Sequence, residues 1–235
     1  MENITEDKIL SIDIGGSNIK LTLLDPNGAL LMDYKKLPTP VPASPENVII
    51  TIKELLKSFP GFDKVSVGFP GYVKNGVVMT APNLGTELWK EVNFSKLLGE
   101  TLSRPVRVVN DADMLGLGVI AGNGLELVIT LGTGFGTALL MNGKLLCHLE
   151  LAHHPVSKDQ TYDVYIGDSA LESKGIEKWN LRMQKVLAIL KTVFNYDSLY
   201  IGGGNAKKLN FKLADNMILF SNKEGIKGGA RLWRD

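Results

Sequence analysis

The sequence predicts a mixed α/β protein in which turns between antiparallel strands bind phosphate. Two segments support this prediction, because each contains an apolar strand, a glycine-rich polar turn and a second apolar strand: residues 12–25 and 129–142. Glycine in such a turn lets backbone N–H groups approach phosphate oxygens without a Cβ in the way. The first turn contains Gly15, Gly16 and Ser17, and the second contains Gly132, Thr133 and Gly134.

The residues after the first turn exclude the two commonest phosphate-binding loops. The Walker loop GxxxxGK[ST] and the Rossmann loop GxGxxG each lead into a helix. Here Ile19, Leu21 and Leu23 alternate with Lys20 and Thr22, which is typical of a strand. The first turn is therefore expected to join strand to strand.

The first half of the chain alternates strands with helices. Strands are expected at residues 9–14, 19–25, 29–37, 64–69 and 106–109. Ser44 is expected to cap a helix that has Pro45 at its first position. A hairpin is expected at residues 74–76, and a helix over residues 112–121.

The second half contains the second of the two strand–turn–strand segments, at residues 129–142. A polar, histidine-containing stretch at residues 150–168 precedes an amphipathic helix over residues 176–195. A last strand at 199–201 runs into a glycine triplet, and a helical region is expected from Leu209 onward. The chain is expected to form two lobes, residues 1–110 and 111–235, with a cleft between them and a C-terminal helix that is a candidate to return to the first lobe.

Composition narrows the possible partners and compartment. A net charge of +1 over 235 residues gives no basic stripe for nucleic acid or an anionic membrane, and no apolar run is long enough to span a bilayer. The lone Cys147 can form neither an intrachain disulfide nor a cysteine zinc site, so no zinc is expected and a reduced, cytoplasmic protein is favoured. The acidic N-terminus lacks the pattern of a signal peptide.

Two charged residues flank the first turn. Asp13 ends the first strand, where a carboxylate can hold Mg²⁺ through water beside bound phosphates, or can simply bond turn amides. Lys20 can point to phosphate or to solvent. Both alternatives stay open from the sequence alone.

Asn110 and Asp111 follow a buried strand and precede a helix. The carboxyl end of a sheet strand is where open α/β sheets place their chemistry, and phosphoryl transfer needs a carboxylate to accept the proton of the attacking hydroxyl. Asp111 suits that role. Both residue types are also favoured helix caps, so capping is the alternative.

Further polar positions suggest a sugar pocket. Glu150 and His153 can bond neighbouring sugar hydroxyls as acceptor and donor, whereas His154 is expected to be a solvated loop residue rather than a metal ligand. Gly71 and Asn83 lie in loops that can complete the pocket or only form turns. Gly202, Gly203 and Gly204 would let a nucleotide base or ribose lie against the backbone.

The chain resembles the ROK family of sugar kinases, and within it the polyphosphate/ATP glucokinases, over essentially its whole length. The resemblance rests on DIGGSNIK, VGFPG, APN, VVNDAD, TLGTGFGTALLMNGKL, ELAHH and IGGG, in that order. It implies an actin-like, ribonuclease-H-like α/β fold with two lobes. It also implies a homodimer with a small-molecule sugar substrate, Mg²⁺ and ATP or polyphosphate as donor.

The resemblance assigns roles residue by residue. Asp111 would be the general base, and Asp13 would hold the metal through water. The expected sugar ligands are Gly71, Asn83, Asn110, Glu150, His153 and, from a short match, Glu172. The expected phosphate and donor residues are Asp13, Gly15, Gly16, Ser17, Lys20, Gly132, Thr133, Gly134, Gly202, Gly203 and Gly204.

Two departures from the family pattern affect these assignments. Ala152 stands where the motif E-x-G-H usually has glycine, which would tilt the backbone of Glu150 and His153. The cysteine-rich zinc motif of many members is absent, as it is from similar polyphosphate glucokinases.

The expected reaction is transfer of a terminal phosphoryl group from polyphosphate or ATP to the 6-hydroxyl of glucose. The alternatives are an ATP-dependent ROK kinase for another hexose or an N-acetylhexosamine, a non-catalytic sugar sensor, and a filament-forming actin relative. The sensors of the family carry an N-terminal helix-turn-helix, whereas the first strand here is expected by Ile9.

Overall fold

A computed structural model describes residues 7–234, which divide into two compact units. Unit 1 contains the residues up to Gly118 and those from Ile226 onward, and unit 2 contains Val119–Gly225. These boundaries differ from the expected lobes 1–110 and 111–235, because helix α4 (Asp111–Val119), except its last residue, and the C-terminal residues group with unit 1.

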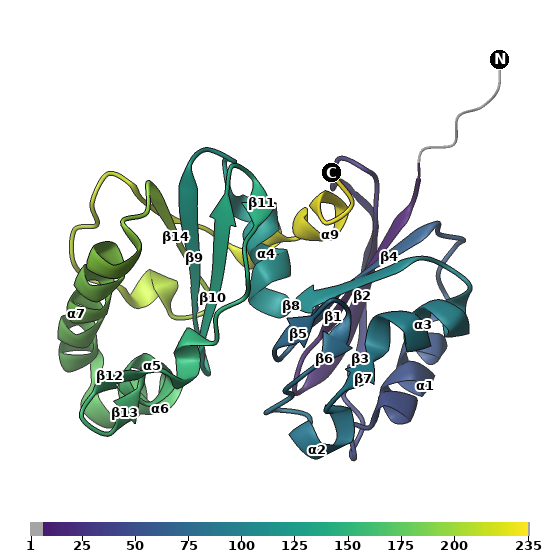
Figure 1. Ribbon diagram of the computed structural model, residues 1–235, viewed down its shortest axis with the longest axis horizontal. Helices are drawn as coiled ribbons and strands as arrows, with labels where there is room; N and C mark the ends of the chain where they lie inside the picture. Colours follow the sequence, from purple (N-terminus) through teal and green to yellow (C-terminus); the bar gives the residue numbers. More distant parts are fainter. Residues whose placement is uncertain (1–6, 235) are drawn as a thin grey trace. The chain divides into compact units, whose positions relative to one another are not determined.

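Unit 1 is built on a five-stranded sheet in the order β3-β2-β1-β4-β8 (Figure 1). The strands are β1 (Ile9–Ile14), β2 (Asn18–Leu24), β3 (Leu30–Pro38), β4 (Lys64–Phe69) and β8 (Val106–Asn110). The first three form the antiparallel meander that the sequence predicts, and β4 and β8 run parallel to β1. The carboxyl ends of β1, β4 and β8 therefore share one edge of the sheet, which is where ligands bind in open α/β sheets.

One face of this sheet is apolar and packs against helices α1 (Pro45–Leu56) and α3 (Phe94–Leu102) (Figure 1). Ser44 caps α1, as predicted, by accepting a hydrogen bond from the backbone N–H of Asn47 at 3.4 Å. Between β4 and α3 the chain forms β5 (Val73–Lys74), β6 (Val77–Val78), α2 (Thr86–Trp89) and β7 (Val92–Asn93). The predicted hairpin at residues 74–76 is the β5–β6 turn, with Asn75 and Gly76 at positive φ.

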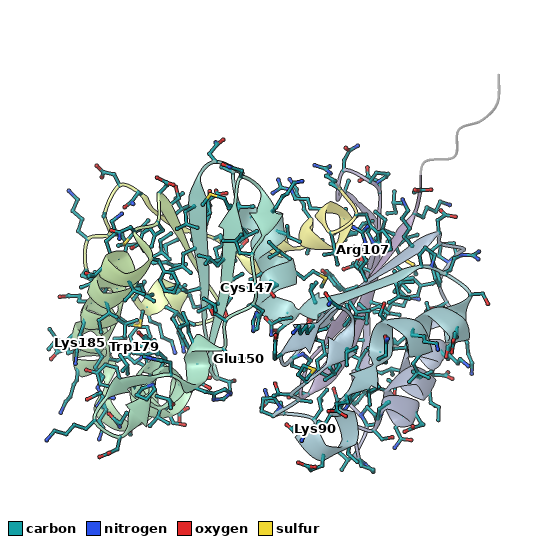
Figure 2. The ribbon with its side chains drawn as sticks, in the orientation of Figure 1. Lys90, Arg107, Cys147, Glu150, Trp179 and Lys185 are labelled. Atoms are coloured by element: carbon teal, nitrogen blue, oxygen red, sulfur yellow. The ribbon has the colours of Figure 1, made fainter. Side chains whose placement is uncertain are left out.

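The opposite face of the sheet is more polar and receives the C-terminal helix α9 (Gly228–Arg231), which follows α8 (Asn222–Gly225). Ser66 on β4 donates its hydroxyl to the carbonyl of Gly229 at 2.5 Å and accepts the indole N–H of Trp233 at 2.8 Å. A guanidinium N–H of Arg107, labelled in Figure 2, donates to the carbonyl of Leu232 at 2.6 Å. The C-terminal segment is thus bonded to β4 and β8.

Unit 2 contains a second five-stranded sheet in the order β11-β10-β9-β14-β15. Its strands are β9 (Leu125–Leu131), β10 (Phe135–Met141), β11 (Lys144–Leu145), β14 (Ser198–Gly202) and β15 (Met217–Leu219). The predicted amphipathic helix is α7 (Ile176–Phe194), which carries Trp179, labelled in Figure 2. Its buried residues, Trp179 and Met183 among them, join the core of β9 and β14.

The expectation of a helical region from Leu209 onward is wrong in its first part. Residues 217–219 instead form β15, which pairs in parallel with β14 at the edge of the sheet. Three residues carry too little periodicity to distinguish a strand from a helix, and the pairing with β14 decides the outcome.

The polar, histidine-containing stretch 150–168 contains short elements. They are η1 (Leu151–His153), β12 (Pro155–Ser157), β13 (Gln160–Thr161) and α5 (Tyr162–Ile166), followed by α6 (Asp168–Lys174); a second 3₁₀ turn, η2 (Ala206–Lys208), follows β14. Tyr162 and Ile166 are buried in the core of unit 2 and fix this stretch on the sheet. Between residues 7 and 234, no helix has both the length and the apolar character that crossing a membrane requires.

Candidate functional site

The first glycine turn joins β1 to β2 and has a well-defined shape. The N–H of Gly15 donates to the carbonyl of Asn18 at 2.9 Å, which closes the turn. Thr39, just after β3, donates its hydroxyl to the carbonyl of Gly15 at 2.6 Å and its N–H to the carbonyl of Ser17 at 3.0 Å. Gly16 and Ser17 are exposed, so their N–H groups can meet a ligand.

The same turn lies beside the loop that contains Asn83. A Cβ added to Gly16 would come within 3.4 Å of the Asn83 Cβ, and the Asn83 residue is exposed. Unit 1 therefore places a candidate sugar ligand next to the candidate phosphate turn, although the two are more than sixty residues apart in the chain.

Lys20 lies directly opposite Asp13 in the β1–β2 pair, and its Nζ contacts Asp13 Oδ2 at 2.9 Å. Both side chains are partly exposed, at 44% and 37%, so the pair can rearrange around a ligand. Tyr34 on β3 is close enough to Asp13 to be affected by its charge. Burial and, secondly, that charge raise the pKa of the Tyr34 hydroxyl to about 12. Asp13 thus lies close to the first turn, in contact with Lys20.

Among residues 7–234, no group of three or more His, Cys, Asp or Glu side chains is arranged to hold a metal ion. Mg²⁺ at a phosphate site needs less than that, because it keeps several waters and is otherwise held by one or two carboxylates and the substrate phosphates. Asp13, alone beside the turn, fits such a water-mediated arrangement.

Asn110 and Asp111 have different surroundings. Asn110 is buried, and its Oδ1 accepts from the N–H groups of Ala112 at 2.8 Å and Asp113 at 3.4 Å, which is the geometry of a helix N-cap. Its Nδ2 donates to the carbonyl of Gly71 at 3.1 Å. Asp111 is exposed in the first turn of α4, where the partial positive charge of the helix terminus favours a carboxylate.

Gly71 is required by packing. A Cβ at this position would lie 2.0 Å from the carbonyl oxygen of Thr80. The bond from Asn110 therefore joins the end of β8 to a tightly fitted turn after β4.

The second glycine turn, in unit 2, is supported by α5 and α6. The N–H of Gly132 donates to the carbonyl of Gly134 at 3.2 Å, and the N–H of Phe135 donates to Asp163 Oδ1 at 2.6 Å. The N–H of Asp168 donates to the carbonyl of Gly132 at 3.1 Å. A Cβ at Gly132 would meet no atom within 4 Å, and Thr133 is exposed, so this turn also has open space beside it.

The glycine triplet lies next to the second turn, because β14 pairs with β9 and the N–H of Asn205 donates to the carbonyl of Leu131 at 3.0 Å. Its first two members are explained by packing. A Cβ at Gly202 would lie 2.2 Å from the Phe220 ring, and one at Gly203, with φ +87°, would lie 2.3 Å from the carbonyl oxygen of Leu131. Gly204 has open space, so it is the member best placed to meet a ligand.

Glu150 precedes η1 in unit 2 and is labelled in Figure 2. Its Oε1 lies 3.4 Å from Nε2 of His148. The contact with His148 is the main cause that lowers the pKa of Glu150; burial opposes it, and the charges of His148 and His153 add to it. His148 is not among the residues predicted from the sequence; the signal available was its spacing from Glu150, since residues two apart in an extended segment share a side.

The other candidates around Glu150 are clearly placed. Ala152 lies within η1 and has no positive φ, so this backbone does not require glycine there. The ring of His154 packs 6.2 Å from that of Tyr162. Glu172 is exposed on α6, and its contact with a sugar stays a prediction.

Comparisons with known proteins identify the family of this chain. Residues 9–154, more than half of the chain, match the profile of the ROK family. The polyphosphate glucokinase of Mycobacterium leprae is 35% identical over 93% of this chain and 72% of its own length. That of Mycobacterium tuberculosis strain CDC 1551 / Oshkosh is 34% identical over 93% of this chain and 88% of its own length.

A solved structure extends the similarity to the whole fold. The inorganic polyphosphate/ATP-glucomannokinase of Arthrobacter sp. strain KM aligns with a TM-score of 0.81 at 32% identity, covering 95% of this chain and 97% of its own. The predicted fold class, an actin-like two-lobed α/β fold, is therefore confirmed. The chain belongs to the ROK family.

Proposed function

We propose that the protein transfers a terminal phosphoryl group from polyphosphate or ATP to the 6-hydroxyl of glucose. The observation that carries this proposal is that each unit contains an open glycine turn between antiparallel strands, together with polar residues suited to a sugar. Three relatives with names that specify polyphosphate as donor, two of them glucokinases and one a glucomannokinase, support the same reaction.

In this mechanism Asp111 accepts the proton of the attacking hydroxyl. Asn110, whose Oδ1 is occupied by α4, has one N–H left for a sugar hydroxyl, because its other N–H goes to Gly71. Asn83, Glu150 and His153 bind the remaining hydroxyls, so the reacting oxygen is fixed in position.

The donor phosphates are bound by backbone N–H groups of both glycine turns, with Lys20 as a nearby cation. Such donors stabilise charge that develops on the transferred group. Mg²⁺, when bound beside Asp13, would neutralise part of the charge on the donor phosphates. Release of Lys20 from its ion pair with Asp13 would let each group take its own partner.

Two groups of lysines favour polyphosphate as a donor. Lys36 on the edge strand β3 lies directly opposite Lys20, and both are on the face that carries Asp13. Lys207 and Lys208 are exposed on η2, after Gly204. Cations next to both turns can bind a polyanion that continues beyond the transferred phosphate.

Initial rates of hexose 6-phosphate formation with polyphosphate and with ATP test the proposal. A sugar sensor would bind glucose and transfer nothing, and a kinase for another hexose or an N-acetylhexosamine would prefer that sugar to glucose. We also propose, from the family resemblance, a homodimer in the cytoplasm; light scattering measures the first and cell fractionation the second.

A further inference from the structure

Glu150 is held by a histidine that lies outside the E-x-G-H motif. The side chain of His148 is only 6% exposed, whereas that of Glu150 is 33% exposed, and their polar atoms lie 3.4 Å apart. A buried ring thus faces a carboxylate that is open enough to meet a ligand.

The backbone on either side of Glu150 is fixed to strand β10. The hydroxyl of Thr137 donates to the carbonyl of Leu149 at 2.9 Å, and the N–H of Leu146 donates to the carbonyl of Leu139 at the same distance. The N–H of Leu151 also donates to the carbonyl of Leu149. With the backbone held in this way, the remaining freedom of Glu150 lies in its own side chain, which His148 contacts.

The chemistry of the pair fixes which atom donates. An ionised carboxylate can only accept hydrogen bonds, so the contact is favourable when Nε2 of His148 carries a proton, whether or not the ring is charged. At 3.4 Å the contact with Glu150 does not complete a hydrogen bond in the structure, so its main effect is to favour one orientation of the carboxylate. Oε2 and the unused lone pairs of Oε1 then stay available to a ligand.

We infer that His148 is a positioning residue, whose buried Nε2–H holds the Glu150 carboxylate in the orientation that accepts a hydrogen bond from a hexose hydroxyl. This inference rests on the proposed function. It assigns to His148 an effect on sugar binding that acts through Glu150, with no direct contact between His148 and the sugar.

Three substitutions of His148 separate positioning from packing. His148→Gln places an amide N–H near the position of Nε2, His148→Asn places it nearer Nδ1, and His148→Leu keeps apolar volume without a donor. We expect the apparent KM for glucose to rise roughly tenfold in His148→Leu, as for a lost hydrogen bond to a charged group. The rise is expected to be clearly smaller in His148→Gln than in His148→Asn. In all three variants, the KM for the phosphate donor is expected to change less than twofold. In the control His154→Leu, the KM for glucose is also expected to change less than twofold.

A second comparison uses Glu150→Gln as background. If His148 acts through the carboxylate, adding His148→Leu to Glu150→Gln raises the KM for glucose by less than about twofold, because interacting residues are not additive. Equal effects in both backgrounds, or equal behaviour of the Gln and Asn variants, would overturn the inference while leaving the proposed function intact. A wild-type protein that phosphorylates glucose with neither donor would instead overturn the proposed function, and the inference with it.

Discussion

Asp111→Asn separates a catalytic role of this residue from a structural one. The amide keeps the size of the side chain but cannot accept the proton of the attacking hydroxyl. Because Asn110 caps α4 and an amide oxygen can still accept the N–H of Ala112, the loss of charge from the first helical turn is expected to cost about 0.3 to 1 kcal/mol of stability. The turnover number is expected to fall by roughly 10² to 10⁴, which corresponds to about 2.7 to 5.4 kcal/mol in the activation barrier.

The assay measures the initial rate of hexose 6-phosphate formation, glucose binding by calorimetry, and urea unfolding on the same preparation. Asn110→Ala is the matched control, because it removes the cap and the bond to the carbonyl of Gly71. Loss of the cap alone is expected to cost about 1 kcal/mol of stability, so this control should be destabilised more than Asp111→Asn. Turnover of Asp111→Asn within about fivefold of wild type would refute the role of general base.

Three further predictions concern the sugar, the donor and the first turn. Glu150→Gln and His153→Ala are expected to raise the KM for glucose by roughly tenfold or more and to leave that for the donor nearly unchanged, since each removes a bond to a hydroxyl; the reverse pattern would place both residues at the donor. Lys36→Gln is expected to raise the KM for long polyphosphate and to weaken its dependence on salt, with little effect on ATP, because fewer counterions are released; equal effects on both donors would contradict this. The pKa of Tyr34 is raised from 10.0 to about 12, so its share of the stability is present below pH 10 and is lost as the pH rises towards 12. The difference in phenolate absorbance between wild type and Tyr34→Phe measures this pKa, and ionisation near pH 10 would contradict it. Asp13→Asn should bring the pKa of Tyr34 only part of the way back towards 10.0, since burial is the larger cause of the raised value.

Much of the fold follows from signals that lie close together in the sequence. The β1–β2 hairpin is visible as alternating residues around glycines, and α1 is visible from Ser44 and Pro45. The strand–turn–helix at Asn110 is equally local. These elements are predicted correctly because each depends on neighbours within a few residues.

The features that escaped prediction depend on partners far away in the chain. Strand β15 exists because it pairs with β14, and Gly202 is covered by Phe220, eighteen residues later. Gly228 fits against α4 so tightly that a Cβ would lie 1.7 Å from the carbonyl oxygen of Met114, which no local pattern reveals.

The candidate site divides in the same way. The glycine turns, Asp13 and Asp111 could be identified from local sequence and from the family motifs. The ion pair between Asp13 and Lys20 needed the register of the sheet, and the contact between His148 and Glu150 needed the burial of the imidazole ring. Neither contact can be read from a motif, although Asp13 and Lys20 both lie in the segment DIGGSNIK.

The most direct test is the initial rate of glucose 6-phosphate formation on one preparation, first with polyphosphate and then with ATP, at low salt. We predict product with polyphosphate, at a rate that falls with added salt more steeply than the rate with ATP, because a polyanion bound by lysines releases counterions. Product with ATP but none above background with polyphosphate would contradict the proposed donor, and no product with either would contradict the assignment as a glucose kinase.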